Sequence, residues 1–227
     1  MTYTWLLFDL DGTLLDYDAA EAAALKESLE ESDVAMTGDL ADVYRRVNRA
    51  LWRKFEAGEV DAKHIRTQRF HELVETLDID VDPEELSERY IRHLAASTHV
   101  RDGAREIVAD LAEDHRIAIV TNGLADVQWP RLRATGFDEL AEVIVISDEV
   151  GVSKPDPAFF DLAFERMGQP DREETIVIGD GLTSDIAGGV TYGIDTCWVN
   201  HAGQDDRLGL DITYEITELD ELPPILR

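Results

Sequence analysis

Short runs of apolar residues recur at intervals along the chain. None of them alternates strictly with polar residues, so each predicts a strand that is buried on both faces, as in a parallel sheet. Turn-forming residues follow several runs and mark where the strands end. The runs occupy residues 5–8, 117–120, 143–146, 175–178 and 196–199.

Apolar positions spaced three or four residues apart separate the last four runs, and this spacing predicts helices. The predicted helices cover residues 103–113, 126–135, 157–167 and 184–190. Ser184 is the expected cap of the last one. Strands that alternate with helices indicate an α/β fold, a Rossmann-like, doubly wound parallel sheet.

A long interval between the first and second strands contains no strand-like run. Its helical patterns cover residues 19–31, 39–56, 62–77 and 83–96. The interval is too long for a crossover loop, so we expect an inserted four-helix domain at residues 16–97. Residues 1–15 and 98–227 would form the Rossmann-like core.

The composition is that of a globular protein. The chain has 227 residues, of which 44% are hydrophobic, enough for one sizeable core and a smaller insertion. No apolar run reaches the roughly 20 residues that a membrane helix needs, and no signal-peptide pattern is present. We therefore expect a cytoplasmic protein without a membrane partner. The single cysteine, Cys197, excludes an internal disulfide, and its apolar surroundings indicate a core residue rather than a nucleophile.

Acidic residues outnumber basic ones by 49 to 21, and the formal net charge is −28. Lysine is rare among the basic residues, a skew that resembles halophilic proteins of salt-loving organisms. Salt at about 1 M shortens the Debye length to ~3 Å and screens repulsion within so acidic a surface. An acidic protein of an ordinary organism is the alternative. In either case, the charge disfavours binding to a nucleic acid polymer.

Two aspartates, Asp9 and Asp11, follow the first apolar run, and Gly12 marks a sharp turn directly after them. Side chains two positions apart on a strand point the same way, so we expect both carboxylates at its carboxyl end. Ligands bind at that end of an open α/β sheet. Two carboxylates so close together require a shared proton, a bound cation or both; an ordinary Asp-Gly turn is the alternative.

Polar residues that suit phosphate oxygens follow the second and third strands. Thr121 and Asn122 offer a hydroxyl, an amide and a backbone N–H after the second strand. Lys154 comes after the third strand, and Pro155 favours an extended conformation for it. A lysine there suits a phosphate clamp and would offset the aspartates, whereas an exposed surface lysine is the alternative.

Two further aspartates follow the fourth strand. Asp180, together with Asp9 and a main-chain carbonyl, would offer the hard oxygen ligands that Mg²⁺ prefers. Asp185 lies near a predicted helix start. It would either interact favourably with the helix dipole or support the metal or Lys154.

In this order, the four motifs resemble those of the haloacid dehalogenase superfamily of phosphohydrolases. They read Asp9-Leu10-Asp11-Gly12-Thr13, Thr121-Asn122, Lys154-Pro155 and Gly179-Asp180 with Asp185. The resemblance covers essentially the whole chain, because the helical insertion is similar to the family's small cap. It implies a Mg²⁺-dependent enzyme.

The resemblance also implies roles for the matching residues. Asp9 would attack phosphorus and become an aspartyl phosphate, while Asp11 would protonate the leaving oxygen and later activate water. The family's dehalogenases lack an aspartate at the position of Asp11, so this residue favours a phosphatase or phosphomutase. The phosphoryl group would be held by Thr121, Asn122 and Lys154. The metal ligands would be Asp9, Asp11 through its carbonyl, and Asp180, with Asp185 in support.

Within the family, the chain is most similar to pyrimidine nucleotide 5′-phosphatases, including enzymes that remove noncanonical nucleotides. The similar segments include residues 47–52, 121–123, 145–152 and 196–200. We therefore expect a monomeric or homodimeric enzyme whose partner is a small phosphorylated metabolite, a nucleoside 5′-monophosphate. A phosphosugar mutase, a phosphoglycolate or sugar phosphatase, and a non-catalytic phosphate-binding regulatory domain are the alternatives.

Some side chains of the insertion are candidates for contacting a base or sugar. They are Asn48, Trp52, Phe55, Arg66, Arg69 and Phe70. The helical spacing of Trp52 and Phe55 is more typical of a core, and the two arginines would form surface ion pairs in so acidic a chain.

The charge pattern predicts that stability depends on salt. We expect the melting temperature to rise from dilute buffer to multimolar potassium chloride, because salt screens the repulsion between carboxylates. Calorimetry across a salt series measures this dependence. An equally high melting temperature in dilute buffer would show that the surface needs no screening.

Overall fold

The computed structural model describes residues 3–205 and 207–226. The chain divides into two compact units. The first comprises Met1–Tyr17, Thr98–Ala125 and Leu132–Arg227. The second comprises Asp18–Ser97 and Asp126–Arg131, so it consists almost entirely of the insertion between the first two strands.

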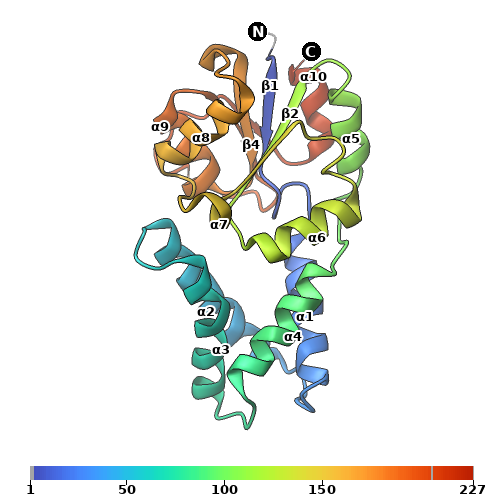
Figure 1. Ribbon diagram of the computed structural model, residues 1–227, viewed down its shortest axis with the longest axis vertical. Helices are drawn as coiled ribbons and strands as arrows, with labels where there is room; N and C mark the ends of the chain where they lie inside the picture. Colours follow the sequence, from blue (N-terminus) through green and yellow to red (C-terminus); the bar gives the residue numbers. More distant parts are fainter. Residues whose placement is uncertain (1–2, 206, 227) are drawn as a thin grey trace. The chain divides into compact units, whose positions relative to one another are not determined.

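A six-stranded parallel sheet forms the centre of the first unit (Figure 1). Its strands follow the order β3-β2-β1-β4-β5-β6. Their bounds are β1 Trp5–Phe8, β2 Arg116–Thr121, β3 Val143–Ile146, β4 Thr175–Gly179, β5 Asp195–Val199 and β6 Tyr214–Ile216. The doubly wound sheet confirms the predicted α/β fold.

All five predicted strands are present, each within one residue of its predicted bounds. The sixth strand, β6, is not predicted by the sequence. Its three residues are too few to show a period, and the strand exists because it pairs with β5 at the edge of the sheet.

Helices cover both faces of the sheet, as the doubly wound fold requires. In Figure 1, α8 (Pro157–Met167) and α9 (Ala187–Tyr192) lie on one side. On the other side lie α5 (Ala104–Leu111) and α10 (Leu222–Leu226). Most of the surface of the strands is therefore shielded from water.

The burial of β1 explains its continuous apolar sequence. Trp5 and Leu7 point into the core that includes Phe159 and Phe160 of α8. The alternate positions, Leu6 and Phe8, are also fully buried. A strand covered on both faces needs apolar side chains at every position. Cys197 of β5 is likewise buried, which confirms that it belongs to the core.

The start of α9 differs from the prediction. Leu182–Ile186 forms a π-helical turn, α9 begins only at Ala187, and the predicted cap at Ser184 is wrong. The turn is held by Asp185 instead, whose Oδ2 accepts a hydrogen bond of 3.0 Å from the backbone N–H of Gly181. This bond keeps the Asp185 carboxylate close to the end of β4.

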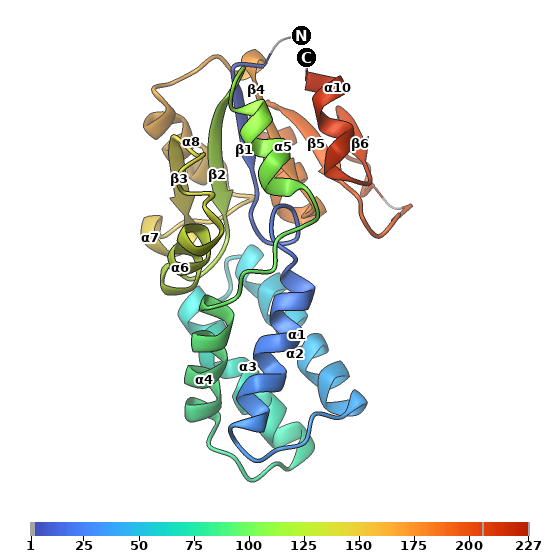
Figure 2. The ribbon, with the colours of Figure 1, turned by 90° about the vertical axis from the view of Figure 1, so that its right-hand side faces the viewer.

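The second unit contains the helices of the insertion (Figure 2). They are α1 Tyr17–Glu30, α2 Gly38–Glu56, α3 Ala62–Leu77 and α4 Pro83–Ala95. α3 packs against both α2 and α4. Aspartates begin two of these helices: Asp61 accepts a hydrogen bond from the N–H of His64, and Asp82 precedes a proline at the first helical position.

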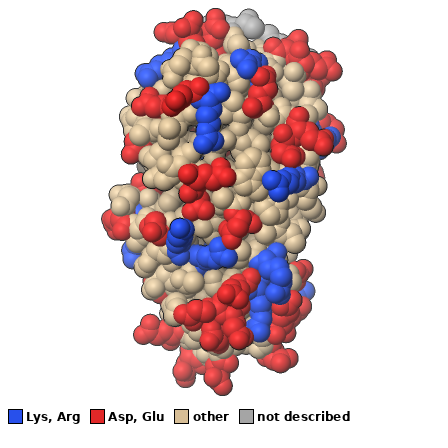
Figure 3. Space-filling model, viewed as in Figure 1, with Lys and Arg blue, Asp and Glu red and all other residues tan. Residues whose placement is uncertain are grey.

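The surface reflects the net charge. On the face shown in Figure 3, acidic side chains are spread widely and fewer basic ones lie between them. Within the described part of the chain, no helix combines the length and apolar composition that a membrane crossing needs.

Candidate active site

The candidate site begins where β1 ends. Asp9 follows Phe8 directly, is 6% exposed, and donates its backbone N–H to the carbonyl of Ile178 in β4 at 2.9 Å. Because Phe8 also lies opposite Ile119 of β2, Asp9 is placed between the ends of two neighbouring strands. The sheet register therefore sets the position of this carboxylate.

Lys154 joins the polar groups at this edge of the sheet. Its ammonium donates to Asp9 Oδ1 at 2.6 Å, to Asp185 Oδ1 at 2.5 Å and to the carbonyl of Val120 at 2.6 Å. The side chain is 1% exposed, so the alternative of a surface lysine is wrong. A buried ammonium requires such partners, because an uncompensated charge in the interior is very costly.

The charges of this cluster shift each other's pKa values. Burial alone would lower the pKa of Lys154, but Asp185 and Asp9 outweigh it and raise that pKa above its ordinary value. Burial and the charge of Asp185 raise the pKa of Asp9, with Lys154 opposing them. Burial and Asp185 also raise the pKa of Asp180 to about 7. The lysine therefore stays charged, while the raised pKa values of Asp9 and Asp180 mean that these carboxyls hold their protons to a higher pH than ordinary aspartates.

Three carboxylates could hold a cation here. Asp9, Asp180 and Asp185 each offer an oxygen, and these oxygens all lie within 4.8 Å of one another. A Cβ at Gly12 would lie only 2.4 Å from Asp180, and one at Gly179 only 2.3 Å from Asp185. Glycine thus leaves room for a carboxylate in both places. A crowded set of hard oxygens, with the pKa values of Asp9 and Asp180 raised, fits a divalent cation such as Mg²⁺.

Asp11 belongs to the turn that follows β1 and not, as the sequence pattern predicts, to a strand. β1 stops at Phe8, and Asp11 belongs to the following turn, where Gly12 adopts a φ of +91° and donates its N–H to the carbonyl of Leu15. Asp11 is half-buried and is not among the three clustered carboxylates. The expectation that both aspartates belong to a strand whose alternation orients them is therefore wrong, because β1 ends before Asp9.

Two residues contribute to the site in ways that the sequence does not predict. Thr13 donates its hydroxyl to Asp180 Oδ1 at 3.2 Å and accepts the N–H of Asp180 at 3.0 Å. Trp198 donates its indole N–H to the carbonyl of Asp180. Thr13 is the last residue of the first motif, and this place in the sequence is the signal that could identify it as a site residue. Nothing in the sequence of β5 identifies Trp198 as one.

Asn122 lies beside the lysine and holds its backbone. The Asn122 amide donates to the carbonyl of Lys154 at 2.9 Å, and its oxygen accepts the N–H of Lys154 at 3.0 Å. Thr121 is fully buried at the end of β2. The side chain of Asn122 thus holds the backbone of Lys154 in place. The sequence predicts Asn122 as a contact of the phosphoryl group and does not predict this contact with the lysine.

The candidates in the second unit have several environments. Phe55 and Phe70 are buried, and Trp52 packs edge-on against Phe55 with ring centroids 5.3 Å apart. The burial of Phe55 confirms its interpretation as a core residue, whereas Trp52 is only half-buried. In this unit, Arg66 forms an ion pair with Asp126.

Arg69 differs from the expectation of a surface ion pair, because it is 2% exposed. Its guanidinium lies 4.4 Å from the ring centroid of Tyr90 and donates to Asn48. Asn48 in turn donates to Glu21 at 2.6 Å. Aromatic and polar partners together make this burial possible.

Comparison with known proteins agrees with this fold and site. Residues 3–193 match the family described as haloacid dehalogenase-like hydrolase. YfnB of Bacillus subtilis (strain 168) is 38% identical over 99% of this chain and 95% of its own length. Its crystal structure, which is bound to magnesium, matches with a TM-score of 0.94 at 37% identity and covers the whole of both chains.

Two further relatives align over almost their full length. The pyrimidine 5′-nucleotidase YjjG of Escherichia coli (strain K12) is 33% identical over 100% of this chain and 99% of its own. The pyrimidine 5′-nucleotidase PynA of Streptococcus pneumoniae is 34% identical over 98% and 94%. The fold and the matches define an α/β hydrolase. This chain belongs to the haloacid dehalogenase-like hydrolases.

The contacts of Asn122 generate a prediction. Asn122→Ala removes two hydrogen bonds to the Lys154 backbone, each worth about 1 kcal/mol, and leaves the lysine less firmly placed. We expect kcat for phosphate release to fall by roughly tenfold or more, as measured in steady-state assays.

Asn200 provides the matched control, because its amide makes the same kind of two-way contact with the backbone of Gln204. Asn200→Ala should lower the melting temperature without a comparable loss of kcat. Equal effects of the two substitutions on kcat would show that the contact with Lys154 has no special importance.

Proposed function

We propose that the chain is a Mg²⁺-dependent phosphatase that hydrolyses a small phosphomonoester, a nucleoside 5′-monophosphate, through an aspartyl phosphate on Asp9. Its membership of the hydrolase family supports the reaction type. The names of the relatives YjjG and PynA support the substrate class. The helical insertion would serve as the cap domain that contacts the leaving group.

The contact of Lys154 with a single oxygen of Asp9 is the observation that carries this proposal. Lys154 binds Oδ1, and among the described residues no hydrogen bond to Oδ2 of Asp9 is found. A carboxylate held by one oxygen is oriented, and its other oxygen remains available to attack an electrophile. Orientation of this kind lowers the entropic part of a reaction barrier.

The proposed reaction has two steps. Asp9 attacks phosphorus, the bond from phosphorus to the leaving oxygen breaks, and Asp11 gives that oxygen its proton. In the second step Asp11 takes a proton from water, the water oxygen bonds to phosphorus, and the bond to Asp9 breaks, which yields inorganic phosphate. A carboxylate nucleophile and a general acid–base divide the hydrolysis into two easier steps.

The other residues of the site would bind and orient the phosphoryl group. Lys154, the Thr121 hydroxyl and the backbone N–H of Asn122 would contact its oxygens. Asp9, the carbonyl of Asp11 and Asp180 would hold Mg²⁺, and Asp185 would position Lys154. When bound, Mg²⁺ supplies positive charge that stabilises the phosphoryl oxygens and keeps Asp9 ionised.

The nucleophile assignment is tested by Asp9→Asn. An amide cannot form the acyl phosphate, so we expect turnover to fall below about one thousandth of the wild-type value. Phosphate release from a panel of nucleoside monophosphates, phosphosugars and phosphoglycolate, with Mg²⁺ and high salt, measures both the loss and the substrate preference.

Asp161→Asn is the matched control. This aspartate of α8 accepts a hydrogen bond from Tyr192 and lies outside the carboxylate cluster, so its substitution should leave turnover near wild type. Near-wild-type turnover of Asp9→Asn would exclude Asp9 as nucleophile. Substrate consumption without stoichiometric phosphate would instead indicate a mutase.

A further inference from the structure

Helix α2 concentrates positive charge in a very acidic chain. Exposed arginines occupy positions 45, 46, 49 and 53 of this helix, and their spacing places them along one side of it. Together they line a hollow of about 480 Å³, with Asp42 and Ala50 as the remaining lining residues. We call this feature the arginine hollow.

Three of these arginines lack an acidic partner. Arg45 forms an ion pair with Asp42 at 2.7 Å. Arg46, Arg49 and Arg53 form neither an ion pair nor a hydrogen bond from their side chains with any residue that the structure describes. Several arginines elsewhere on the surface are paired with glutamates, among them Arg89, Arg92, Arg116 and Arg207.

This difference has a physical meaning. With 49 acidic residues available, three neighbouring arginines without partners leave a local excess of positive charge. Their guanidinium groups retain donors that suit the oxygens of phosphate groups. The hollow is therefore chemically suited to an anion that the rest of the surface would repel.

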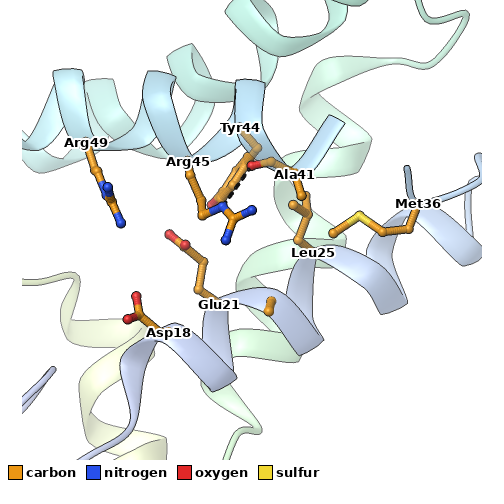
Figure 4. A pocket seen from close by; sticks show the side chains of 9 residues that line it. Asp18, Glu21, Leu25, Met36, Ala41, Tyr44, Arg45 and Arg49 are labelled. Atoms are coloured by element: carbon orange, nitrogen blue, oxygen red, sulfur yellow. Dashed lines mark hydrogen bonds between the residues drawn. The ribbon is translucent and has the colours of Figure 1, made fainter. Parts of the chain in front are cut away.

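A second, narrower pocket adjoins the arginine hollow. It has a volume of about 170 Å³, lies between α1 and α2, and shares Arg45 and Arg49 with the hollow. Leu25, Met36 and Tyr44 give it apolar and aromatic walls. Figure 4 shows Arg45 and Arg49 extending from α2 towards Glu21 and Asp18 of α1.

We propose that the arginine hollow and this pocket together bind a nucleoside polyphosphate, at a site that the hydrolytic reaction does not require. Arg46 and Arg53 are seven positions apart, about 10 Å along the helix, so they suit two or more phosphate groups better than one. The narrow pocket takes the planar base against its apolar walls. Carboxylates at its edge accept hydrogen bonds from amino groups of the base.

Binding of ATP to the full chain in metal-free buffer tests the proposal, with isothermal titration calorimetry as the measurement. Arg53→Ala should weaken binding about tenfold, the size expected for one charged hydrogen bond to phosphate. Lys54→Ala is the matched control, because Lys54 is the next residue of α2, is exposed, carries the same charge and lines neither cavity. Its affinity for ATP should stay within twofold of wild type.

Two further ligands separate the parts of the site. Inorganic triphosphate should bind more weakly than ATP and should show the same loss with Arg53→Ala. Adenosine alone should be the weakest ligand and insensitive to that substitution.

Several results would overturn the proposal. These are no binding of ATP to wild type, equal losses for Arg53→Ala and Lys54→Ala, or triphosphate binding as tightly as ATP. A fourth is a wild-type dimer that dissociates when Arg46, Arg49 and Arg53 are replaced by alanine, since the hollow would then hold a second copy of the chain. Sedimentation velocity detects that dimer, and an unchanged melting temperature shows that the variants fold.

Discussion

The contact of the Lys154 ammonium with three oxygens is the interaction on which the polar edge of the sheet depends. One oxygen belongs to Asp9 after β1, one to Val120 at the end of β2, and one to Asp185 after β4. Removing one partner of a buried ion pair costs about 3–5 kcal/mol, because the remaining charge stays uncompensated. The lysine therefore connects the segments after separate strands through a single charged group.

This contact is possible only because of the order of the strands. β1 lies between β2 and β4, so segments that are far apart in the sequence end side by side. The strands are buried on both faces and hold this register rigidly, while the polar residues sit just beyond them. Chemistry at the carboxyl edge is thereby separated from the packing that stabilises the sheet. The π-helical turn at Leu182–Ile186 completes the edge, because it returns Asp185 towards the lysine.

The sequence predicts features that depend on local patterns and on motif order, and it predicts less well those that depend on distant partners. Five strands follow from apolar runs, and the proximity of Asp9, Lys154 and Asp180 follows from the ends of parallel strands. Strand β6 and the burial of Arg69 depend on neighbours that no local pattern specifies. Strand alternation does not set the direction of Asp11, because β1 ends at Phe8 and Asp11 belongs to the following turn.

Trapping the covalent intermediate tests the central claim, that Asp9 is the nucleophile, most directly. Enzyme quenched during turnover of a nucleoside monophosphate and treated with borohydride should carry reduced side chains only at position 9, as peptide mass spectrometry would show. Without substrate no such peptide should appear. Efficient phosphate release with Asp9 unmodified, or with the modification at another aspartate, would contradict the account.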